Sequence, residues 1–308
     1  MKPFNSYQYL EGTQMTERDK KQVGSKFWNE GKWNNFVAPF LPENGEGMSL
    51  VDMGCNAGVF LKLAEDRGFA PVIGVDSDRE SIQRGEEWRN KQGGRYKFIN
   101  SDLNDCIDQL PIVDYTVLAN AHYYFTINDW IDYLDQLRLK SRFVIVVTAE
   151  KHHVNRCWAS ADVPSIRNYF KDWEEVGFVD ELPLAGDPDP RRLWSLCFKS
   201  KYLDKVPLES LDSSNHVQDQ FYGELDEGKD FKDTRYYRIL KKYRAKWGEQ
   251  KLHEWFSERI KVYDSLKEDG LMKPILVDHF RKDRILDGNH RYAMMRNLGY
   301  KEVFIRYV

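Results

Sequence analysis

The sequence lacks several features that would place it in a class at once. Its 308 residues include four cysteines, Cys55, Cys106, Cys157 and Cys197, with no Cys-x-x-Cys pair and no secreted disulfide spacing. We therefore expect reduced thiols in a cytoplasmic protein. The N-terminal MKPFNSYQYLEG has no apolar core, and no later run is long enough to cross a bilayer. The sequence thus predicts neither a signal peptide nor a membrane span.

An excess of positive charge is also missing. Lys and Arg number 46 against 49 Asp and Glu, which gives a net charge of -3. Because a nucleic-acid binder usually carries a broad basic surface, this balance disfavours nucleic acid as a partner. Hydrophobic residues make up 41% and charged residues 31% of the chain. This composition supports real cores with a well-solvated surface, and the length indicates about two domains.

Short apolar runs alternate with helical stretches between residues 49 and 199. The runs are SLVDM, PVIGV, YKFIN, VDYTVLA, FVIVVT and LWSLCFK. Buried runs of this length, separated by helices, predict an α/β fold with a parallel, doubly wound sheet. Residues 1–48 precede them and have the amphipathic character of helices.

The composition changes after this region. Residues 201–228 are polar and predict a linker. DTRYYRILKKYRAKW and QKLHEWFSERIKVYDSLKEDG then predict two helices, and PILVD and VFIRYV predict strands. We therefore expect a second, small α+β domain over residues 229–308.

A glycine-containing turn follows the first predicted strand. The segment DMGCNAG, residues 52–58, places an acidic residue before the turn, and a helix is expected from about Val59. Gly54 and Gly58 allow positive φ and a close approach of ligand to backbone, and Asn56 tolerates the left-handed region better than most residues. The spacing differs from the G-x-G-x-x-G of a dinucleotide site.

Polar residues also follow the next three strands, in GVDSD, INSDL and VLANAHYYF. Asp76 is placed to accept hydrogen bonds from a ribose diol, and Asp102 from an exocyclic amine. Asn120 and His122 fall at the carboxyl edge of the sheet, where open α/β sheets bind ligands. These residues together predict a nucleoside-type site at that edge.

In this order, the motifs resemble a class I S-adenosylmethionine-dependent methyltransferase. The family's first motif is normally D/E-x-G-x-G-x-G, and Asn56 replaces its middle glycine. The resemblance implies S-adenosylmethionine as cofactor, and the residues that it implies for the methionine end are Asp52, Gly54, Cys55, Asn56 and Gly58. It also implies that Asp76 binds the ribose hydroxyls, Asp102 the adenine amine, and the Asn120 carbonyl the methionine amino group. The alternative is a Rossmann-like domain that binds another nucleotide or none.

Candidate acceptor residues lie on both sides of these motifs. The segment GSKFWNEGKWNNFVAPFLPENG resembles the helix before the first motif in some methyltransferases of glycans or small metabolites. This resemblance implies that Trp28 and Trp33 cover the cofactor or stack on an acceptor, although packing of the helix on the sheet explains them equally. Arg191 and Arg192 are candidates for binding an anionic acceptor, with a stiff hairpin turn of solvated arginines as the alternative.

His122 is the candidate catalytic base, because an imidazole of near-neutral pKa can take a hydroxyl proton. A structural histidine is the alternative. The loop HHVNRCW, residues 152–158, pairs two histidines but offers no third ligand at a suitable spacing, so we expect no metal site.

The stretch ILDGNHRYAMMRNLG, residues 285–299, reads as a strand end, a turn and a helix. Together with DGLMKPILV before it, it resembles the ParB/sulfiredoxin-like fold over about residues 250–308. Members with a histidine–arginine pair at the turn, including free-serine kinases, bind a nucleotide phosphate there, and helix N-termini and arginines do favour phosphate. The residues implied for phosphate binding are Gly288, Asn289, His290 and Arg291. Asp287 is implied as a catalytic residue, with ATP and Mg as further cofactors.

We therefore predict a cytoplasmic two-domain enzyme. Residues 1–200 form a methyltransferase domain with an N-terminal helical lid, 201–228 a linker, and 229–308 a ParB/sulfiredoxin-like, kinase-like domain. The expected reaction is O-methylation of a glycan or polar metabolite, which the second domain would also phosphorylate. Two alternatives stay open. One is a nucleic-acid methyltransferase with a C-terminal recognition module, and the other is a C-terminal domain that is purely structural or partner-binding.

Overall fold

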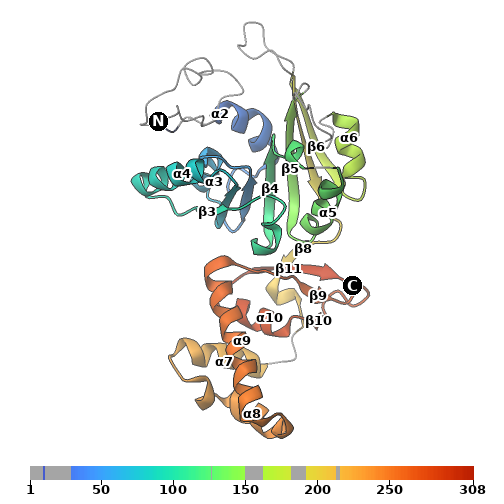
Figure 1. The fold of residues 1–308 in the computed structure, drawn as a ribbon. Helices are drawn as coiled ribbons and strands as arrows, with labels where there is room; N and C mark the ends of the chain where they lie inside the picture. The colour runs from blue at the N-terminus through green and yellow to red at the C-terminus, as the bar shows by residue number, and fades with distance from the viewer. Residues whose placement is uncertain (1–9, 11–28, 126, 150–161, 182–191, 213–215) are drawn as a thin grey trace. The chain divides into compact units, whose positions relative to one another are not determined.

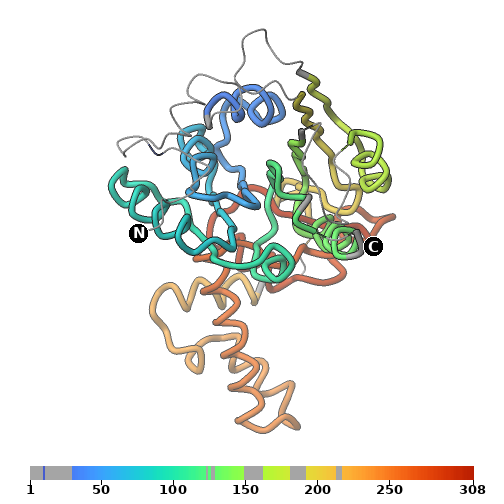
Figure 2. Tube along the Cα trace, turned by 45° about the horizontal axis from the view of Figure 1, so that its top comes forward, coloured from blue at the N-terminus to red at the C-terminus, as the bar shows by residue number. Residues whose placement is uncertain are grey.

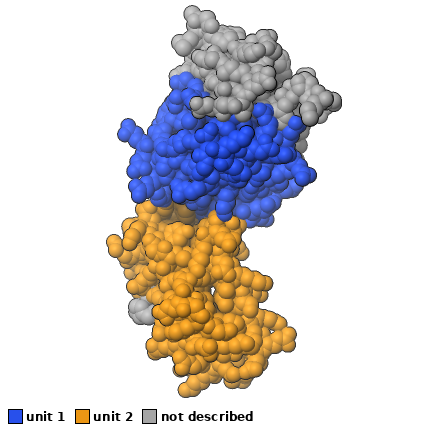
Figure 3. Space-filling model, turned by 90° about the vertical axis from the view of Figure 1, so that its left-hand side faces the viewer, with its two compact units in different colours: residues 1–201 blue, residues 202–308 orange. Residues whose placement is uncertain are grey.

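The computed structural model describes residue 10 and residues 29–125, 127–149, 162–181, 192–212 and 216–308. The chain divides into two compact units, Met1–Lys201 and Tyr202–Val308, which Figure 3 distinguishes by colour. None of the described helices combines the length and apolar character needed to cross a membrane.

Unit 1 contains a seven-stranded sheet in the order β3-β2-β1-β4-β5-β7-β6. The strands are β1 (Leu50–Met53), β2 (Val72–Asp76), β3 (Lys97–Asn100), β4 (Val113–Ala119), β5 (Ser141–Ala149), β6 (Glu174–Glu181) and β7 (Leu193–Lys199). Strands β1 to β5 run parallel, whereas β7 lies antiparallel to both β5 and β6. All carboxyl ends of the parallel strands therefore meet at one edge.

The helical segments of unit 1 lie on both sides of this sheet. They are α2 (Asn29–Lys32), η1 (Trp33–Val37), η2 (Ala38–Phe40), α3 (Val59–Asp66), α4 (Arg79–Gln92), η3 (Ile107–Gln109), η4 (His122–Tyr124), α5 (Ile127–Leu137) and α6 (Val163–Tyr169). Figure 1 shows α3 and α4 on one side of the sheet and α5 and α6 on the other. This is the doubly wound arrangement that the alternating pattern predicts.

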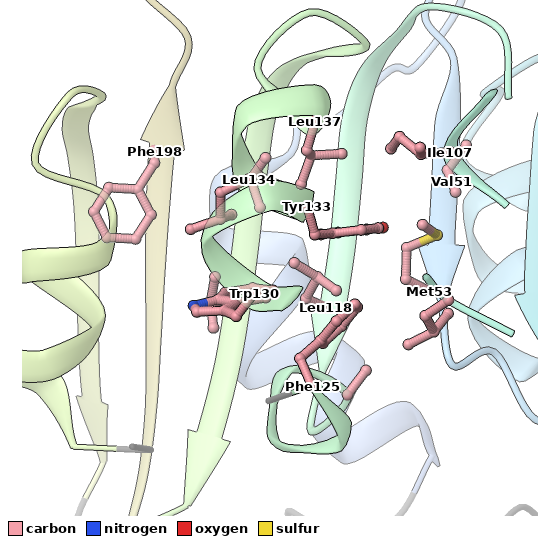
Figure 4. Close-up of a cluster of buried hydrophobic side chains, with 14 of the residues drawn as sticks. Val51, Met53, Ile107, Leu118, Phe125, Trp130, Tyr133, Leu134, Leu137 and Phe198 are labelled. Carbon is pink, nitrogen blue, oxygen red and sulfur yellow. The ribbon is translucent and has the colours of Figure 1, made fainter. Parts of the chain in front are cut away.

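Successive residues of a strand point to opposite faces, so each strand supplies two cores. Val51 and Met53 of β1 pack in the cluster that contains α5 and α6, whereas Leu50 packs with η1 and α3. Figure 4 shows the first cluster, in which Trp130 of α5 lies between β7 and β4. Burial on both faces explains why these strands read as unbroken apolar runs.

Two details of the sheet differ from the prediction. The sheet is not wholly parallel, because β7 joins it antiparallel after β6. Strand β6 was not predicted at all, since its sequence EEVGFVDE has no apolar run. It is an edge strand, and Val176 and Phe178 are 47% and 40% exposed. An edge strand with one solvated face needs few apolar residues.

Unit 2 combines a four-stranded sheet with helices. Its elements are β8 (Asp204–Pro207), η5 (Leu208–Ser210), α7 (His216–Asp226), η6 (Phe231–Asp233), α8 (Arg235–Tyr243), η7 (Ala245–Trp247), α9 (Gly248–Asp269), β9 (Ile275–Val277), β10 (Ile285–Asp287), α10 (Asn289–Asn297) and β11 (Glu302–Tyr307). The sheet order is β10-β9-β11-β8, in which β9 and β11 are parallel and the outer pairs antiparallel. Figure 2 follows α9 in orange along its full length.

The segment predicted as a linker, residues 201–228, is instead largely part of this fold. Strand β8 pairs with β11, and α7 follows it. Leu208 and Leu211 are buried, and Phe221 and Tyr222 are fully buried. The polar composition concealed these few anchoring residues, which pair and pack with elements up to a hundred residues later in the chain.

Candidate functional site

The turn after β1 brings the predicted glycine-loop residues together at the end of the parallel strands. The N–H groups of Gly54 and Cys55 donate to the Val75 carbonyl at 2.8 and 3.0 Å, which ties the turn to β2. Gly58 begins α3 with a φ of 84°, and a Cβ there would lie 2.6 Å from the Phe98 ring. No other residue type fits that position without displacing the ring.

Asn56 connects this turn to the end of β2. It adopts a φ of 52°, and its N–H donates to Asp76 Oδ2 at 2.8 Å. Its side-chain amide donates to the hydroxyl of Ser81 at 3.2 Å, and that hydroxyl donates to Asp78 Oδ2 at 2.6 Å. The Asp78 N–H in turn donates to Asp76 Oδ1 at 2.8 Å. The four residues therefore hold the Asp76 carboxylate in one orientation.

Two carboxyl groups dominate the electrostatics of this edge. Asp52 is 2% exposed, and burial raises its pKa to about 8. The negative charge of Asp76 adds to the rise, whereas the positive charge of Lys32 opposes it. Burial also raises the pKa of Asp76, while N–H donors from Asp78 and Asn56 act in the opposite direction. Such a pair favours a ligand with cationic or hydroxyl groups.

Asp102 and Asn120 complete the predicted set at the ends of β3 and β4. Asp102 is exposed, and its Oδ1 accepts from the N–H and side-chain amide of Asn104 at 2.9 and 3.1 Å. Asn120 has a φ of 60°, and its N–H donates to the Val147 carbonyl at 2.9 Å. The structure thus places all the predicted cofactor residues at the carboxyl edge of β1 to β4.

Residues 27–178 match the family model of a methyltransferase domain. This part of the chain is a methyltransferase domain. The match confirms the predicted domain type, with the class I fold in its sheet order and S-adenosylmethionine as its methyl donor. The match does not extend to residues 202–308.

An uncharacterized protein of Haemophilus influenzae is 26% identical over 122 residues, which cover 38% of this chain and 47% of the relative. The chain thus spans about half the length of the curated relative that it matches.

Several solved structures share a distant likeness with the chain. TehB from Haemophilus influenzae is 14% identical, with a TM-score of 0.42 over 50% of this chain and 58% of that one. Magnesium protoporphyrin IX methyltransferase from Synechocystis PCC 6803 is 16% identical, with a TM-score of 0.46 over 61% and 86%. The N-methyltransferase NodS from Bradyrhizobium japonicum WM9 is 17% identical, with a TM-score of 0.41 over 50% and 78%. These likenesses are too distant to carry an acceptor over to this chain.

His122, the predicted base of the methyltransferase domain, is fully buried. Its Nε2 lies 3.4 Å from the hydroxyl of Thr148 on β5, and its ring packs against Trp130 of α5. An acceptor cannot touch a side chain that has no exposed surface. The structure therefore corrects the catalytic assignment and favours the structural alternative.

The structure also gives other roles to two of the residues that were predicted to bind the acceptor, Trp33 and Arg192. Trp33 is 3% exposed and packs on Phe60 of α3 with ring centroids 5.5 Å apart, so it belongs to the core. Arg192 pairs with Asp180 of β6 across the antiparallel strands, at 2.7 Å from Nε to Oδ1. Trp28 and Arg191 lie outside the described residues.

In unit 2, the predicted phosphate turn has the expected backbone but different side-chain contacts. Gly288 precedes α10 with a φ of 101°. Arg291 Nη1 donates to the carbonyls of Lys273 and Pro274 at 3.0 and 2.6 Å, and Nη2 donates to Asp287 Oδ2 at 2.7 Å. The guanidinium that was predicted to bind phosphate is therefore bound within the protein, as is the predicted catalytic carboxylate.

His290 is likewise held by its neighbours. Its Nδ1 lies 3.0 Å from the Tyr222 hydroxyl and its Nε2 3.2 Å from the Tyr236 hydroxyl, and its ring meets Trp255 edge to face. Burial lowers the pKa of His290, and the positive charge of Arg259 lowers it further, to about 4. The imidazole is neutral at pH 7, so the prediction that it binds phosphate directly is not supported by its contacts.

A cavity of about 770 Å³ lies beside this turn, within unit 2. Gln218 of α7 and Arg259 of α9 line it together with Asn289 and His290. Sequence reasoning missed both new residues, because Gln218 fell in the predicted linker and Arg259 on a helix with many charges. The Trp255–Arg259 spacing of four residues was the available signal, since it places both side chains on one helical face.

Proposed function

We propose that the protein is an S-adenosylmethionine-dependent methyltransferase of a polar small molecule or glycan, and that it methylates oxygen. The observation that supports methyl transfer most directly is the Asn56–Asp76–Ser81–Asp78 network within the matched methyltransferase domain. The oxygen acceptor is proposed from the resemblance of residues 24–45 to the pre-motif helix of glycan and metabolite methyltransferases.

The residues present fit the proposed cofactor. Asp76 offers oriented carboxylate oxygens to two hydroxyl donors, and Gly54 and Gly58 let the backbone approach a ligand closely. Asp52 provides a buried carboxyl group, and a cationic ligand beside it would lower its raised pKa and favour the carboxylate. The bound cofactor supplies an electrophilic methyl group on a sulfonium. The chain's contribution is then to hold that methyl in line with the acceptor and to exclude water.

Cofactor binding tests this proposal. Replacing Asp76→Ala should weaken binding of S-adenosylhomocysteine at least tenfold, because two hydroxyl acceptors are lost, each bond to a charged group contributing about 1.5–3 kcal/mol. Isothermal titration calorimetry on the full chain measures this. Asp66→Asn is the matched control, since Asp66 lies on the surface of α3 and pairs with Lys62. Equal affinity of Asp76→Ala and the native chain would contradict the assignment.

The acceptor class needs a separate assay. Native protein with S-adenosylmethionine should release S-adenosylhomocysteine in the presence of hydroxylated sugars or polyols, measured by mass spectrometry together with the methylated product. Release that responds only to RNA or DNA would favour the alternative of a nucleic-acid methyltransferase.

For unit 2, we propose a ParB/sulfiredoxin-like domain that binds a nucleotide. The cavity beside the α10 N-terminus supports ligand binding, and its volume falls in the ordinary range for small-molecule sites. The proposed phosphorylation of the acceptor has less support, because Asp287 is occupied by Arg291. Incubation with ATP, Mg and an acceptor, with no ATP consumed, would reject the kinase step. If Arg291→Ala leaves the affinity for ATP unchanged but abolishes association of the protein with itself or a partner, unit 2 is a structural or partner-binding domain.

A further inference from the structure

The cavity in unit 2 has an excess of positive charge on its walls. Arg259, Lys261 and Lys273 line it, against Glu258. Asp287 and Arg291 also line it but are paired with each other, so their charges offset. Val262, Leu266, Leu271 and Met294 supply apolar surface. A wall of this kind suits a ligand with an apolar or aromatic body and an anionic group.

Arg259 is fixed in position, and one N–H group of its guanidinium has no acceptor among the described residues. The guanidinium lies 3.4 Å from the Trp255 ring centroid, and Nη1 donates to the Trp255 carbonyl at 3.1 Å. Its Nε is buried, and none of the residues that the structure describes accepts a hydrogen bond from it. Burial lowers the pKa of Arg259. An anion in the cavity would satisfy this donor and offset the cost of burying the charge.

Gln218 provides an independent indication of a ligand. The residue is 7% exposed and lines the cavity. Its Nε2 donates to the Tyr236 hydroxyl at 3.5 Å, whereas its Oε1 is buried with no donor among the described residues. A buried amide oxygen without a partner is costly, and such atoms usually meet a water or a ligand. A hydroxyl or amine of a ligand would satisfy it.

The start of α10 contributes further donors. The first bond of this helix runs from the Tyr292 N–H to the Gly288 carbonyl at 2.8 Å. The N–H groups of Asn289, His290 and Arg291 precede it and have no carbonyl within the helix. All three residues line the cavity. Three N–H donors, a guanidinium and two lysines exceed what a carboxylate can accept, and they match the three oxygens of a phosphate.

We propose that this cavity binds a phosphorylated small molecule through Arg259 and the α10 N-terminus, with Gln218 accepting a hydrogen bond from a hydroxyl or amine of the ligand. Arg291 is then a structural residue that joins the turn to the Lys273 and Pro274 carbonyls. This inference rests on the proposed ligand-binding role of unit 2. It departs from that proposal in assigning the side-chain contacts to Gln218 of α7 and Arg259 of α9, while His290 and Arg291 contribute only their backbone N–H groups.

Calorimetry on the full chain tests the inference with AMP, glucose 6-phosphate and inorganic phosphate as ligands. At least one organic phosphate should bind, and it should bind more tightly than inorganic phosphate. Arg259→Gln should weaken that binding at least tenfold and Gln218→Leu at least threefold. Arg238→Gln, on the exposed face of α8, should leave affinity unchanged. Arg291→Gln should lower the melting temperature and change affinity less than threefold.

A second measurement uses the native chain and does not depend on folding of a variant. Phenylglyoxal modifies arginine, and mass spectrometry reports the rate at each residue. The bound ligand should slow modification of Arg259 and leave that of Arg238 unchanged.

The outcomes separate this inference from the proposed nucleotide site. If AMP binds with equal affinity to native and Arg259→Gln protein and gives Arg259 no protection, the inference fails and nucleotide binding stands. Arg259-dependent binding of glucose 6-phosphate without AMP supports the inference and rejects the nucleotide. A Kd of about 1 mM corresponds to a binding free energy of only about 4 kcal/mol. If none of the three ligands binds at 10 mM, both the inference and the proposed nucleotide site are overturned.

Discussion

Asn56 occupies the position where the methyltransferase motif normally has its middle glycine. Its φ of 52° is in the left-handed region, which asparagine tolerates better than most residues with a side chain. Its amide also bonds to Ser81, a contact that glycine cannot make. The departure from the motif therefore adds a link between the glycine turn and the Asp76 carboxylate.

This link predicts a graded effect on cofactor affinity. Asn56→Ala loses the bond and strains the turn by about 1–2 kcal/mol, so we expect about tenfold weaker binding of S-adenosylhomocysteine. Asn56→Gly keeps the backbone conformation and should lose only about threefold. Calorimetry measures both. If the alanine variant bound as well as the native chain, Asn56 would have no positioning role.

His290 makes the stability of unit 2 depend on pH. Its pKa is lowered to about 4 in the folded chain from an ordinary 6.5. Between these values the unfolded chain binds a proton that the folded chain does not, so stability is full above pH 6.5 and falls as pH drops toward 4. From pH 7 to pH 5 we expect a loss of about 2 kcal/mol.

Urea unfolding at the two pH values, followed by tryptophan fluorescence, measures this loss. Other groups titrate in the same range, so His290→Gln is the matched comparison. The variant should be less stable than the native chain at pH 7 and should lose about 2 kcal/mol less on acidification. An equal loss in both proteins would contradict the low pKa.

At the scale of elements, Thr234 decides where α8 begins. Thr234 is fully buried. Its hydroxyl accepts a hydrogen bond from the Tyr237 N–H at 3.2 Å and donates one to the Phe231 carbonyl at 2.6 Å. The helix then presents Tyr236 to His290. This cap therefore links a local sequence signal to the cavity.

Thr234→Ala should destabilise unit 2 by about 1 kcal/mol, the usual cost of removing a helix N-cap. Thr234→Ser keeps the hydroxyl and should recover most of that loss. Chemical denaturation of both variants gives the comparison. Equal destabilisation by serine and alanine would show that the methyl group, rather than the cap, matters.

Sequence periodicity predicted the central strands and the edge strand β3, and it missed the edge strands β6 and β8. The apolar runs of β1, β4 and β5 are buried on both faces, which makes them visible in the sequence. Strand β6 has one solvated face, and β8 has only four residues. Both depend on pairing with distant strands, and no local pattern encodes that pairing.

At the scale of the whole molecule, the two units have separate sheets and separate compact packing. We therefore expect two unfolding transitions in differential scanning calorimetry. S-adenosylhomocysteine at about a hundred times its Kd should stabilise the first unit by about 2.7 kcal/mol. That raises its melting temperature by about 5–10 °C.

The transition of unit 2 should not move with this ligand, and the organic phosphate that binds the cavity should move it instead. Asp76→Ala, which weakens cofactor binding, should abolish the first shift. A single transition that both ligands raise together would show that the units unfold as one.

The sequence by itself determined the methyltransferase domain and the strand ends at which its candidate cofactor residues lie. Parallel strands end at one edge, so acidic residues and glycines at successive strand ends meet there whatever the details of packing. Only the tertiary structure decided which candidates were available to a ligand. Burial encloses His122 and Trp33, and internal carbonyls take Arg291. The tertiary structure also brings Gln218 and Arg259 from separate helices to one cavity. Contacts between distant segments depend on packing rather than on local sequence pattern.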